Sequence, residues 1–285
     1  MAQVIDGKKC AADVRAKVAA GVQDLIRAKG VKPGLAVILV GEDPASQVYV
    51  KNKGKAAEEA GLASWQFNYP KDVEPSKVFA KIDELNRDET VHGILVQMPL
   101  PKQFDSAKVI EAISPAKDVD GFHPVSVGKL TSGLPGLRPC TPVGCIHLLE
   151  VAGAKLEGAE AVVVGRSNIV GKPVALLLLE RHATVTICHS RSRDLGGIVS
   201  RADVVIAAVG KPKMVKGEWI KKGAYVIDVG INRLPDGKLC GDVDYETAKE
   251  RAAAITPVPG GVGPMTIAYL LHNTLEAAKA TSAKG

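Results

Sequence analysis

A lysine on the apolar side of a predicted helix is the residue of this sequence best suited to acid–base chemistry. Apolar spacing predicts a helix from about Gln47 to Ala60, whose apolar side carries Tyr49, Val50, Ala56, Ala57 and Ala60. Lys53 is the one charged residue on that side. Because packing against a core removes water from the ammonium group, the pKa of Lys53 should fall, and its amine could transfer protons near neutral pH. The alternative is a buried stem whose ammonium group reaches water.

Two further polar groups stand where they could share a site with Lys53. Gln97 ends a predicted strand, and open α/β sheets bind ligands at the carboxyl ends of their strands. Segment 117–121 (KDVDG) places two carboxylates in one turn, either as an Asx turn or as the source of a substrate-binding carboxylate. No metal site is expected, because Lys129 occupies the position where a calcium loop needs its glutamate. The histidines lack metal-ligand spacing, and no GxSxG motif indicates a serine nucleophile.

A turn that begins at Gly165 predicts an anion-binding site. It follows the β-branched run 161–164 and precedes an apolar helical segment that Pro173 opens, so backbone N–H groups and a helix N-terminus meet there. The sequence GRSNIVGKP differs from the dinucleotide fingerprint GxGxxG, because Ser167 replaces the second glycine. It also differs from a P-loop, because five residues separate its glycines. An ordinary βα turn is the alternative to a nucleotide site.

The residues after the next predicted strand, 183–188, favour NADP over NAD. An NAD site usually has Asp or Glu about 20 residues after the glycine turn, on the ribose 2′-hydroxyl. Here segment 189–193 reads HSRSR, and Arg166 lies in the glycine turn itself. Guanidinium groups and hydroxyls bind a 2′-phosphate, whereas a carboxylate repels it. The alternative is a solvated basic loop.

A glycine- and proline-rich segment near the C-terminus predicts a second ligand-contacting turn. Segment 257–264 reads PVPGGVGP and precedes a predicted helix from about Met265 to Ala280. Its glycines would let backbone N–H groups approach a flat ligand closely. A linker is the alternative, although this segment is neither polar nor flexible in composition.

The elements that must position these residues alternate between strand and helix, which indicates parallel α/β sheets. In the first part of the chain we expect strands at 35–40, 64–69 and 92–97 and helices at 6–30, 47–60 and 76–86. A second alternation begins at Val162 and includes strands at 183–188, 204–208 and 225–229. The Pro- and Gly-rich interval 118–142 is the predicted junction. The predicted fold class is therefore α/β, with two α/β domains flanking a cleft.

Composition excludes several classes of protein. A chain of 285 residues with 46% apolar and 24% charged residues is typical of a soluble two-domain protein, and no apolar run is long enough for a membrane span. The net charge of +6 comes with only 4% aromatic residues, so anionic small molecules are expected as partners rather than nucleic acid. Five scattered cysteines without a CxxC pair predict reduced thiols in the cytoplasm.

Six segments in order resemble the bifunctional methylenetetrahydrofolate dehydrogenase/cyclohydrolase (FolD) family. They are YVKNK (49–53), GILVQMPL (93–100), KDVDG (117–121), PCTP (139–142), VVVGRSNIVGKP (162–173) and TPVPGGVGPMT (256–266). The resemblance covers nearly the whole chain. It implies a folate-binding catalytic domain over residues 1–121, onto which a helix of about 264–285 packs back. It also implies a Rossmann-like NADP-binding domain with a parallel sheet over residues 122–285.

The resemblance implies two reactions of one-carbon metabolism, in support of purine biosynthesis. Hydride passes from 5,10-methylenetetrahydrofolate to NADP⁺, and water then converts the 5,10-methenyl product to 10-formyltetrahydrofolate. The family is homodimeric, and its folates often carry several glutamates, which suit a basic surface.

The resemblance also implies the roles of individual residues. Lys53 transfers the proton in the cyclohydrolase reaction, Tyr49 lines the pterin pocket, Gln97 orients Lys53, and Asp120 anchors the pterin. The implied cofactor-binding residues are Gly165, Arg166, Ser167, Ser190 and Ile231. The implied substrate-binding residues are Tyr49, Lys53, Val96, Gln97, Met98, Asp120, Pro259, Gly260, Gly261, Val262 and Gly263.

Two other functions are weighed against this one. A monofunctional folate dehydrogenase, linked to NADP or to NAD, would not need Lys53, Gln97 and Asp120 together with Arg166 and Ser190. A non-catalytic NADP-binding sensor would not need a lysine on an apolar helix face. Both alternatives are therefore disfavoured.

Overall fold

The computed structural model describes residues 1–283, which divide into two compact units. The Gly165 unit comprises Met1–Ala12 and Thr141–Thr266, and the Lys53 unit comprises Asp13–Cys140 and the segment that begins at Ile267. This division differs from the predicted boundary after residue 121, since the Lys53 unit continues to Cys140 and the first residues of the chain belong to the Gly165 unit.

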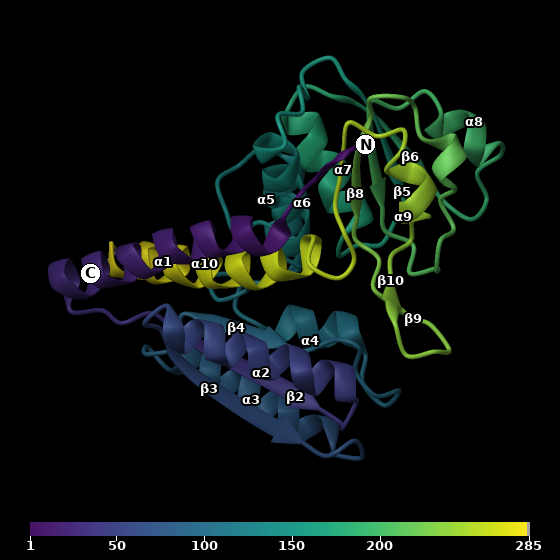
Figure 1. The fold of residues 1–285 in the computed structure, drawn as a ribbon. Helices are drawn as coiled ribbons and strands as arrows, with labels where there is room; N and C mark the ends of the chain where they lie inside the picture. The colour runs from purple at the N-terminus through teal and green to yellow at the C-terminus, as the bar shows by residue number, and fades with distance from the viewer. Residues whose placement is uncertain (284–285) are drawn as a thin grey trace. The chain divides into compact units, whose positions relative to one another are not determined.

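The Gly165 unit is built on a six-stranded parallel sheet with the order β1-β11-β8-β7-β5-β6 (Figure 1). Its strands are β1 (Gln3–Val4), β5 (Glu160–Val164), β6 (Thr184–Cys188), β7 (Val204–Ala207), β8 (Tyr225–Asp228) and β11 (Ala254–Ile255). Strands β5 and β7 are apolar runs buried on both faces, as expected where helices cover a parallel sheet. Strand β1 is absent from the strands predicted above, and its pairing with β11 draws the N-terminus into this unit.

Helices and a hairpin complete the Gly165 unit. They are α6 (Cys140–Val151), α7 (Gly171–Glu180), α8 (Leu195–Val199), α9 (Tyr245–Ala248), the 3₁₀ turn η1 (Gly217–Trp219) and the antiparallel pair β9 (Asn232–Arg233) and β10 (Leu239–Cys240). One core cluster joins β5, β7 and β8 to the segments around α8, α9 and η1. Helix α7 begins at Gly171, two residues before Pro173.

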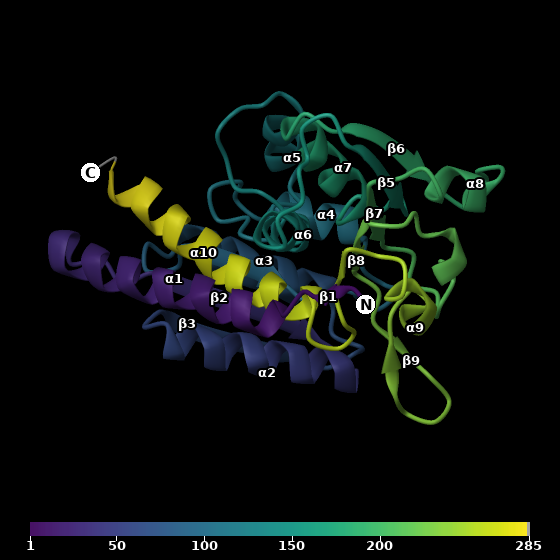
Figure 2. The same cartoon turned by 45° about the horizontal axis from the view of Figure 1, so that its top comes forward.

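The Lys53 unit contains a three-stranded parallel sheet with the order β3-β2-β4. The strands are β2 (Gly34–Val40), β3 (Ala63–Tyr69) and β4 (Gly93–Val96). The helices are α1 (Gly7–Lys29), α2 (Pro44–Glu59), α3 (Pro75–Arg87), α4 (Ser106–Ala112), α5 (Pro124–Thr131) and α10 (Val262–Ser282). Helices α1 and α10 begin in the other unit. Central strand β2 is buried throughout, because α2 packs against the sheet and α3 with α4 supplies a second apolar cluster. Helices α1 and α10 lie side by side in both views (Figures 1 and 2).

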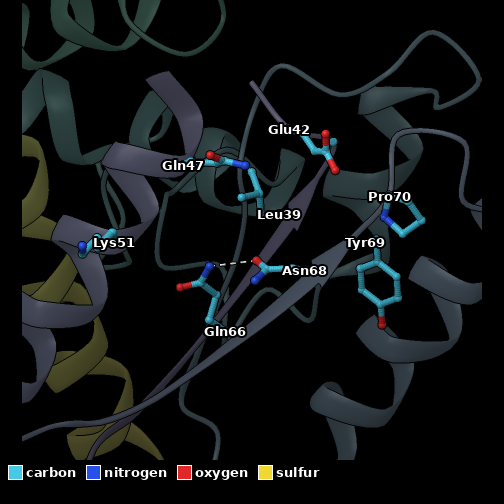
Figure 3. A pocket seen from close by; sticks show the side chains of 9 residues that line it. Leu39, Glu42, Gln47, Lys51, Gln66, Asn68, Tyr69 and Pro70 are labelled. Atoms are coloured by element: carbon cyan, nitrogen blue, oxygen red, sulfur yellow. Dashed lines mark hydrogen bonds between the residues drawn. The ribbon is translucent and has the colours of Figure 1, made fainter. Parts of the chain in front are cut away.

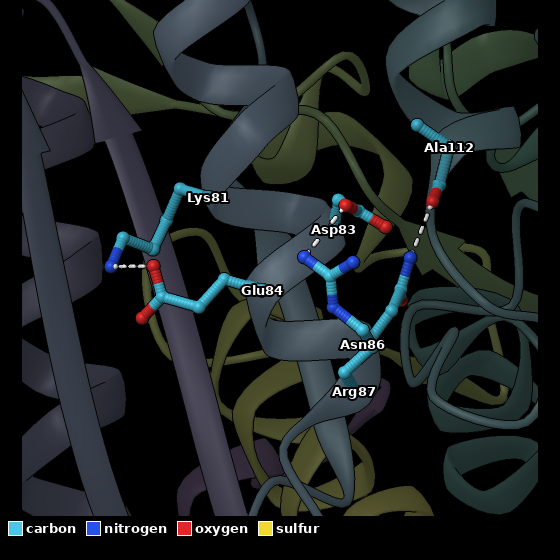
Figure 4. Close-up of polar contacts among 6 residues, drawn as sticks. All are labelled: Lys81, Asp83, Glu84, Asn86, Arg87 and Ala112. Carbon is cyan, nitrogen blue, oxygen red and sulfur yellow. Dashed lines mark hydrogen bonds and ion pairs between the residues drawn. The ribbon is translucent and has the colours of Figure 1, made fainter.

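The carboxyl end of α3 anchors the segment that leads to the KDVDG turn (Figure 4). Asn86 donates from Nδ2 to the Ala112 carbonyl at 2.8 Å, and its Oδ1 accepts from the Ser114 N–H at 2.8 Å. Lys117 donates from Nζ to the carbonyl oxygens of Leu85 and Asp88. The helix itself carries the pair Lys81–Glu84, in which Lys81 is half-buried, and the exposed pair Arg87–Asp83, which contributes little to stability.

Two predicted helix starts are wrong for identifiable reasons. Helix α2 begins at Pro44 rather than near Gln47, because the Asp43 carboxylate caps it by accepting from the Ser46 N–H. Helix α10 begins at Val262 rather than Met265, so the glycine-rich segment supplies its first turn. The predicted junction, 118–142, includes the division between the two units after Cys140 and also contains a helix, α5. The end of the predicted helix 264–285 lies outside the described residues.

Candidate active site

Lys53 lies on the buried side of α2, as the helix pattern predicts. The residue is only 5% exposed, which rules out the alternative in which its ammonium group reaches water freely. Its Nζ donates to Gln97 Oε1 at 3.0 Å and lies 5.3 Å from the centre of the Tyr49 ring, one helical turn earlier. The amine therefore has a defined acceptor and an aromatic neighbour in place of bulk water.

Burial sets the protonation balance between Lys53 and Asp120. Removal from water lowers the pKa of the Lys53 ammonium below its usual value, and the charges of Asp120 and Cys140 oppose that shift. Burial also raises the pKa of Asp120 to about 6, against the opposing effect of Lys53. At neutral pH Asp120 is therefore mainly ionised, and Lys53 has a larger neutral fraction than an exposed lysine has.

Gln97 is held by its own strand so that its side-chain oxygen faces Lys53. Its backbone N–H donates to the Ile38 carbonyl at 2.9 Å, which continues the pairing of β4 with β2. Its Nε2 donates to the Met98 carbonyl at 2.7 Å, so the amide cannot turn without losing a bond. This leaves Oε1 as the acceptor for Lys53.

The two carboxylates of the KDVDG turn have different surroundings. Asp118 is buried and accepts from the N–H groups of Phe122 and His123 and from Ser126 Oγ. The Asp118 backbone also forms a parallel β-bridge with Ile94 of β4, which fixes the turn beside the strand that precedes Gln97. The Asp118 side chain therefore stabilises the turn, as in an Asx turn, whereas the Asp120 carboxylate interacts electrostatically with Lys53.

Two residues that position this turn were not singled out from the sequence. Cys140 is buried, and its Sγ donates to the Val119 carbonyl at 3.2 Å. Asn273 of α10 donates from Nδ2 to the carbonyls of Val119 and Arg138, each at 2.8 Å. The bonds fix the backbone next to Asp120. Cys140 lies in the PCTP segment, which could have pointed to it, whereas no local pattern points to Asn273.

The predicted cofactor turn is shaped by close backbone approach. Gly165 has φ of +129°, and a Cβ there would lie 2.1 Å from the Ala208 carbonyl oxygen. A Cβ on Gly171 would lie 2.3 Å from the Gly165 carbonyl oxygen. Ser167 Oγ accepts from the N–H groups of Val170 and Gly171 and so occupies the start of α7. This compact turn, free of side chains at its closest points, fits the phosphates of a dinucleotide.

The predicted cofactor residues all follow strands of the same sheet. Gly165, Arg166 and Ser167 follow β5, Ser190 follows β6, and Ile231 follows β8. Arg166 and Ser190 are exposed, as is Ile231 at 52%. Carboxyl ends of parallel strands share one edge of a sheet, so these residues share the edge at which open α/β sheets bind ligands.

The glycine-rich segment before α10 packs on the start of α1 inside the Gly165 unit. A Cβ on Gly7 would lie 1.8 Å from the Gly261 carbonyl oxygen, so the two backbones are in contact. Gly260 has φ of +105°, which favours glycine. The segment is a defined turn rather than a linker, and Val262 and Gly263 already belong to α10.

A cavity of about 450 Å³ in the Lys53 unit lies apart from these residues (Figure 3). It is lined by Leu39, Gly41, Glu42, Gln47, Lys51, Gln66, Asn68, Tyr69 and Pro70. None of the predicted site residues is among them, and its polar side chains are largely exposed. Within residues 1–283 no group of His, Cys, Asp and Glu residues could hold a metal ion, and no helix has the length and apolarity to cross a membrane.

Comparison with known proteins places this two-unit α/β protein among folate enzymes. Residues 5–120 match the catalytic domain of tetrahydrofolate dehydrogenase/cyclohydrolase, and residues 139–282 match the NAD(P)-binding domain of the same family. A bifunctional FolD protein of Geobacter sulfurreducens is 61% identical over 279 residues, which cover 98% of each chain.

Solved structures agree. The bifunctional FolD methylenetetrahydrofolate dehydrogenase/cyclohydrolase of Campylobacter jejuni is 46% identical, with a TM-score of 0.95 over 99% of this chain and 100% of that one. The FolD enzyme of Trypanosoma brucei, solved with NADP and an inhibitor, is 41% identical, with a TM-score of 0.94 over 98% of each chain. The chain belongs to the tetrahydrofolate dehydrogenase/cyclohydrolase family. The predicted α/β class with two domains, the family, the pair of enzyme activities and the NADP cofactor are thereby confirmed.

Proposed function

We propose that Lys53 is the proton-transfer residue of the cyclohydrolase reaction. The observation that carries this role is the buried Lys53–Gln97 hydrogen bond at 3.0 Å, which holds a poorly hydrated amine in one orientation. Asp120 anchors the pterin and keeps part of the Lys53 population protonated, and Tyr49 shapes the pocket beside the amine. Val96 and Met98 flank Gln97 and complete this side of the folate site.

The hydration step then follows from proton balance. Neutral Lys53 accepts a proton from water while the water oxygen bonds to the cationic methenyl carbon. The ammonium formed donates its proton to the ring nitrogen as the carbon–nitrogen bond breaks. The new hydroxyl loses its proton to solvent as it becomes the formyl carbonyl. One proton is released overall, which balances the charge of the methenyl cation.

We propose that the edge of the six-stranded sheet binds NADP. The cofactor supplies the hydride acceptor when bound, so the chain's own task in the oxidation is to position it. The turn at Gly165 admits the pyrophosphate, and Ser167, Arg166 and Ser190 contribute hydroxyls and a guanidinium for the 2′-phosphate. Ile231 offers an exposed apolar surface for the nicotinamide end. Segment 259–263 (Pro259–Gly263) is proposed to contact folate.

The Asp120→Asn variant tests the coupling between Asp120 and Lys53. The Asp120 carboxylate raises the pKa of Lys53, so its neutralisation should lower that pKa further. Because neutral Lys53 is the base, the rise of cyclohydrolase rate with pH should move to lower pH, even though weaker pterin binding lowers the overall rate. The separation between the profiles should be largest above pH about 6, where Asp120 of the wild type is ionised.

The measurement is the disappearance of methenyltetrahydrofolate as a function of pH. Asp83→Asn, which alters an exposed carboxylate paired with Arg87, is the matched control and should leave the profile in place. An unmoved profile in Asp120→Asn would show that the carboxylate does not tune the lysine.

We propose that the protein is a homodimer that pairs through β6. This strand ends the sheet order, so its outer edge has no neighbour among the described strands. Ile187 in β6 is 41% exposed, and Leu179 of α7 is 61% exposed. Ile187→Lys should convert a dimer into a monomer, which light scattering measures; a wild-type chain that is monomeric at micromolar concentration would contradict this.

We also propose a cellular setting. The scattered cysteines support a cytoplasmic location, and the product 10-formyltetrahydrofolate is suited to purine biosynthesis. The net charge of +6 supports polyglutamylated folates as substrates.

A further inference from the structure

Two buried aspartates at the carboxyl edge of the six-stranded sheet have no role in the chemistry described so far. Asp242 is 0% exposed and Asp228 is 3% exposed. The Asp242 carboxylate accepts from the N–H groups of Val209, Gly210 and Lys211 at 2.6, 2.9 and 2.8 Å. It also accepts from Asn232 Nδ2 at 2.9 Å. One carboxylate thus binds the loop after β7 and the segment after β8.

Asp228 in turn holds Asp242. Its carboxylate accepts from the N–H groups of Gly230, Asp242 and Val243 at 3.0, 2.9 and 2.9 Å. Its own N–H donates to Thr256 Oγ1 at 2.8 Å, just after β11. The two aspartates therefore connect the segments that follow β7, β8, β10 and β11.

Two glycines show how closely these segments are packed. A Cβ on Gly230 would lie 2.2 Å from Asp242 Oδ1, and a Cβ on Gly241 would lie 1.8 Å from Asp228 Oδ2. Either contact is too short for any side chain. The carboxylates are thus enclosed by backbone, so a small change in either would move the loops themselves.

The loops that the two aspartates fix lie near the point where the strand order of the sheet reverses. From β5 the chain proceeds to β6 on one side and then to β7 on the other, which makes the β5–β7 boundary the switch point at which open α/β sheets bind ligands. The Gly165 turn packs on Ala208, immediately before the loop that Asp242 fixes. Ile231 is exposed between Gly230 and Asn232, each bonded to one of the aspartates.

We propose that Asp242, supported by Asp228, is a positioning residue for hydride transfer: it fixes loop 209–211 and Ile231 against the nicotinamide half of NADP. The inference rests on the proposed binding of NADP at this edge. Since hydride transfer depends on placement of the reacting atoms, displacement of these loops should slow oxidation without touching the cyclohydrolase residues, all of which belong to the Lys53 unit.

The Asp242→Asn variant tests the proposal. An amide of the same shape turns an NH₂ group toward backbone donors, so the loop must shift. The specificity constant for NADP⁺ in methylenetetrahydrofolate oxidation should fall at least tenfold, with a raised NADP⁺ KM and an unchanged folate KM. Hydrolysis of methenyltetrahydrofolate, assayed without NADP⁺, should change less than twofold. Asp203→Asn at the opposite edge of the sheet, where the carboxylate accepts from the Glu160 N–H, is the matched control.

A milder variant distinguishes a local effect on the NADP site from misfolding of the protein. Asn232→Ala removes one of the four donors to Asp242 and should raise the NADP⁺ KM in the same direction by about threefold. The proposal would be overturned if Asp242→Asn lost both activities in parallel and Asn232→Ala left the NADP⁺ KM unchanged. The aspartates would then have only a general structural role. Failure of the NADP site itself is distinguishable, because Gly165→Ala would then leave NADP binding intact.

Discussion

Lys53→Met is expected to lower the cyclohydrolase rate by about two to four orders of magnitude while NADP-dependent oxidation continues. Methionine fills a similar volume and suits the buried face of α2, but it cannot carry a proton. The variant should therefore fold, bind NADP and release methenyltetrahydrofolate that accumulates. Simultaneous recording of NADPH formation and of the methenyl absorbance measures both steps in one sample.

The matched control is Lys51→Met on the exposed side of the same helix. It makes the same chemical change two residues away and should hydrolyse the methenyl substrate at the wild-type rate. Wild-type hydrolysis by Lys53→Met would remove Lys53 from the mechanism. Loss of both steps, with normal unfolding, would assign it to folate binding rather than to proton transfer.

Gly165→Ala is expected to abolish dehydrogenase activity while cyclohydrolase activity remains. The new Cβ would meet the Ala208 carbonyl oxygen at 2.1 Å, at a φ of +129° that side chains rarely adopt. Backbone strain of this kind costs about 1–3 kcal/mol, so the turn should move away from the pyrophosphate and weaken NADP and NAD alike. Calorimetric titration with each cofactor measures the loss.

Two variants separate the causes of that loss. Gly153→Ala changes a glycine with φ of +80° and open space around it, so it adds backbone strain without a clash and should leave cofactor binding unchanged.

Arg166→Ala leaves the turn intact and removes an exposed guanidinium, so it should weaken NADP binding much more than NAD binding. Equal losses for both cofactors would contradict the assignment of Arg166 to the 2′-phosphate.

The sequence predicts the site best where a residue conflicts with its local pattern. A charge on the apolar side of a helix marked Lys53, and its burial followed from α2 packing on the sheet. Gln97 was predicted from the strand end alone. By contrast, the KDVDG pattern could not tell Asp118 from Asp120, because the partners that make Asp118 structural are backbone N–H groups and Ser126 in the following turn and helix.

What the sequence could not predict depends on contacts between distant segments. Strand β1 has two residues and exists because β11, some 250 residues later, offers it an edge. Asn273 reaches Val119 across a sequence separation of 154 residues. Asp228 and Asp242 were not singled out, because their partners are mostly backbone N–H groups, whose positions no side-chain pattern reveals. Local propensity carries no information on such pairings.

The most direct test of the account is titration of the Lys53 amine itself. NMR of protein with labelled lysine side chains, in which the Lys53 signal is identified by its absence from Lys53→Met, measures its pKa. We expect a value below the ordinary lysine value of about 10.4 and a further decrease in Asp120→Asn. An ordinary pKa for Lys53, unchanged when Asp120 is neutralised, would contradict the proposed role of Lys53.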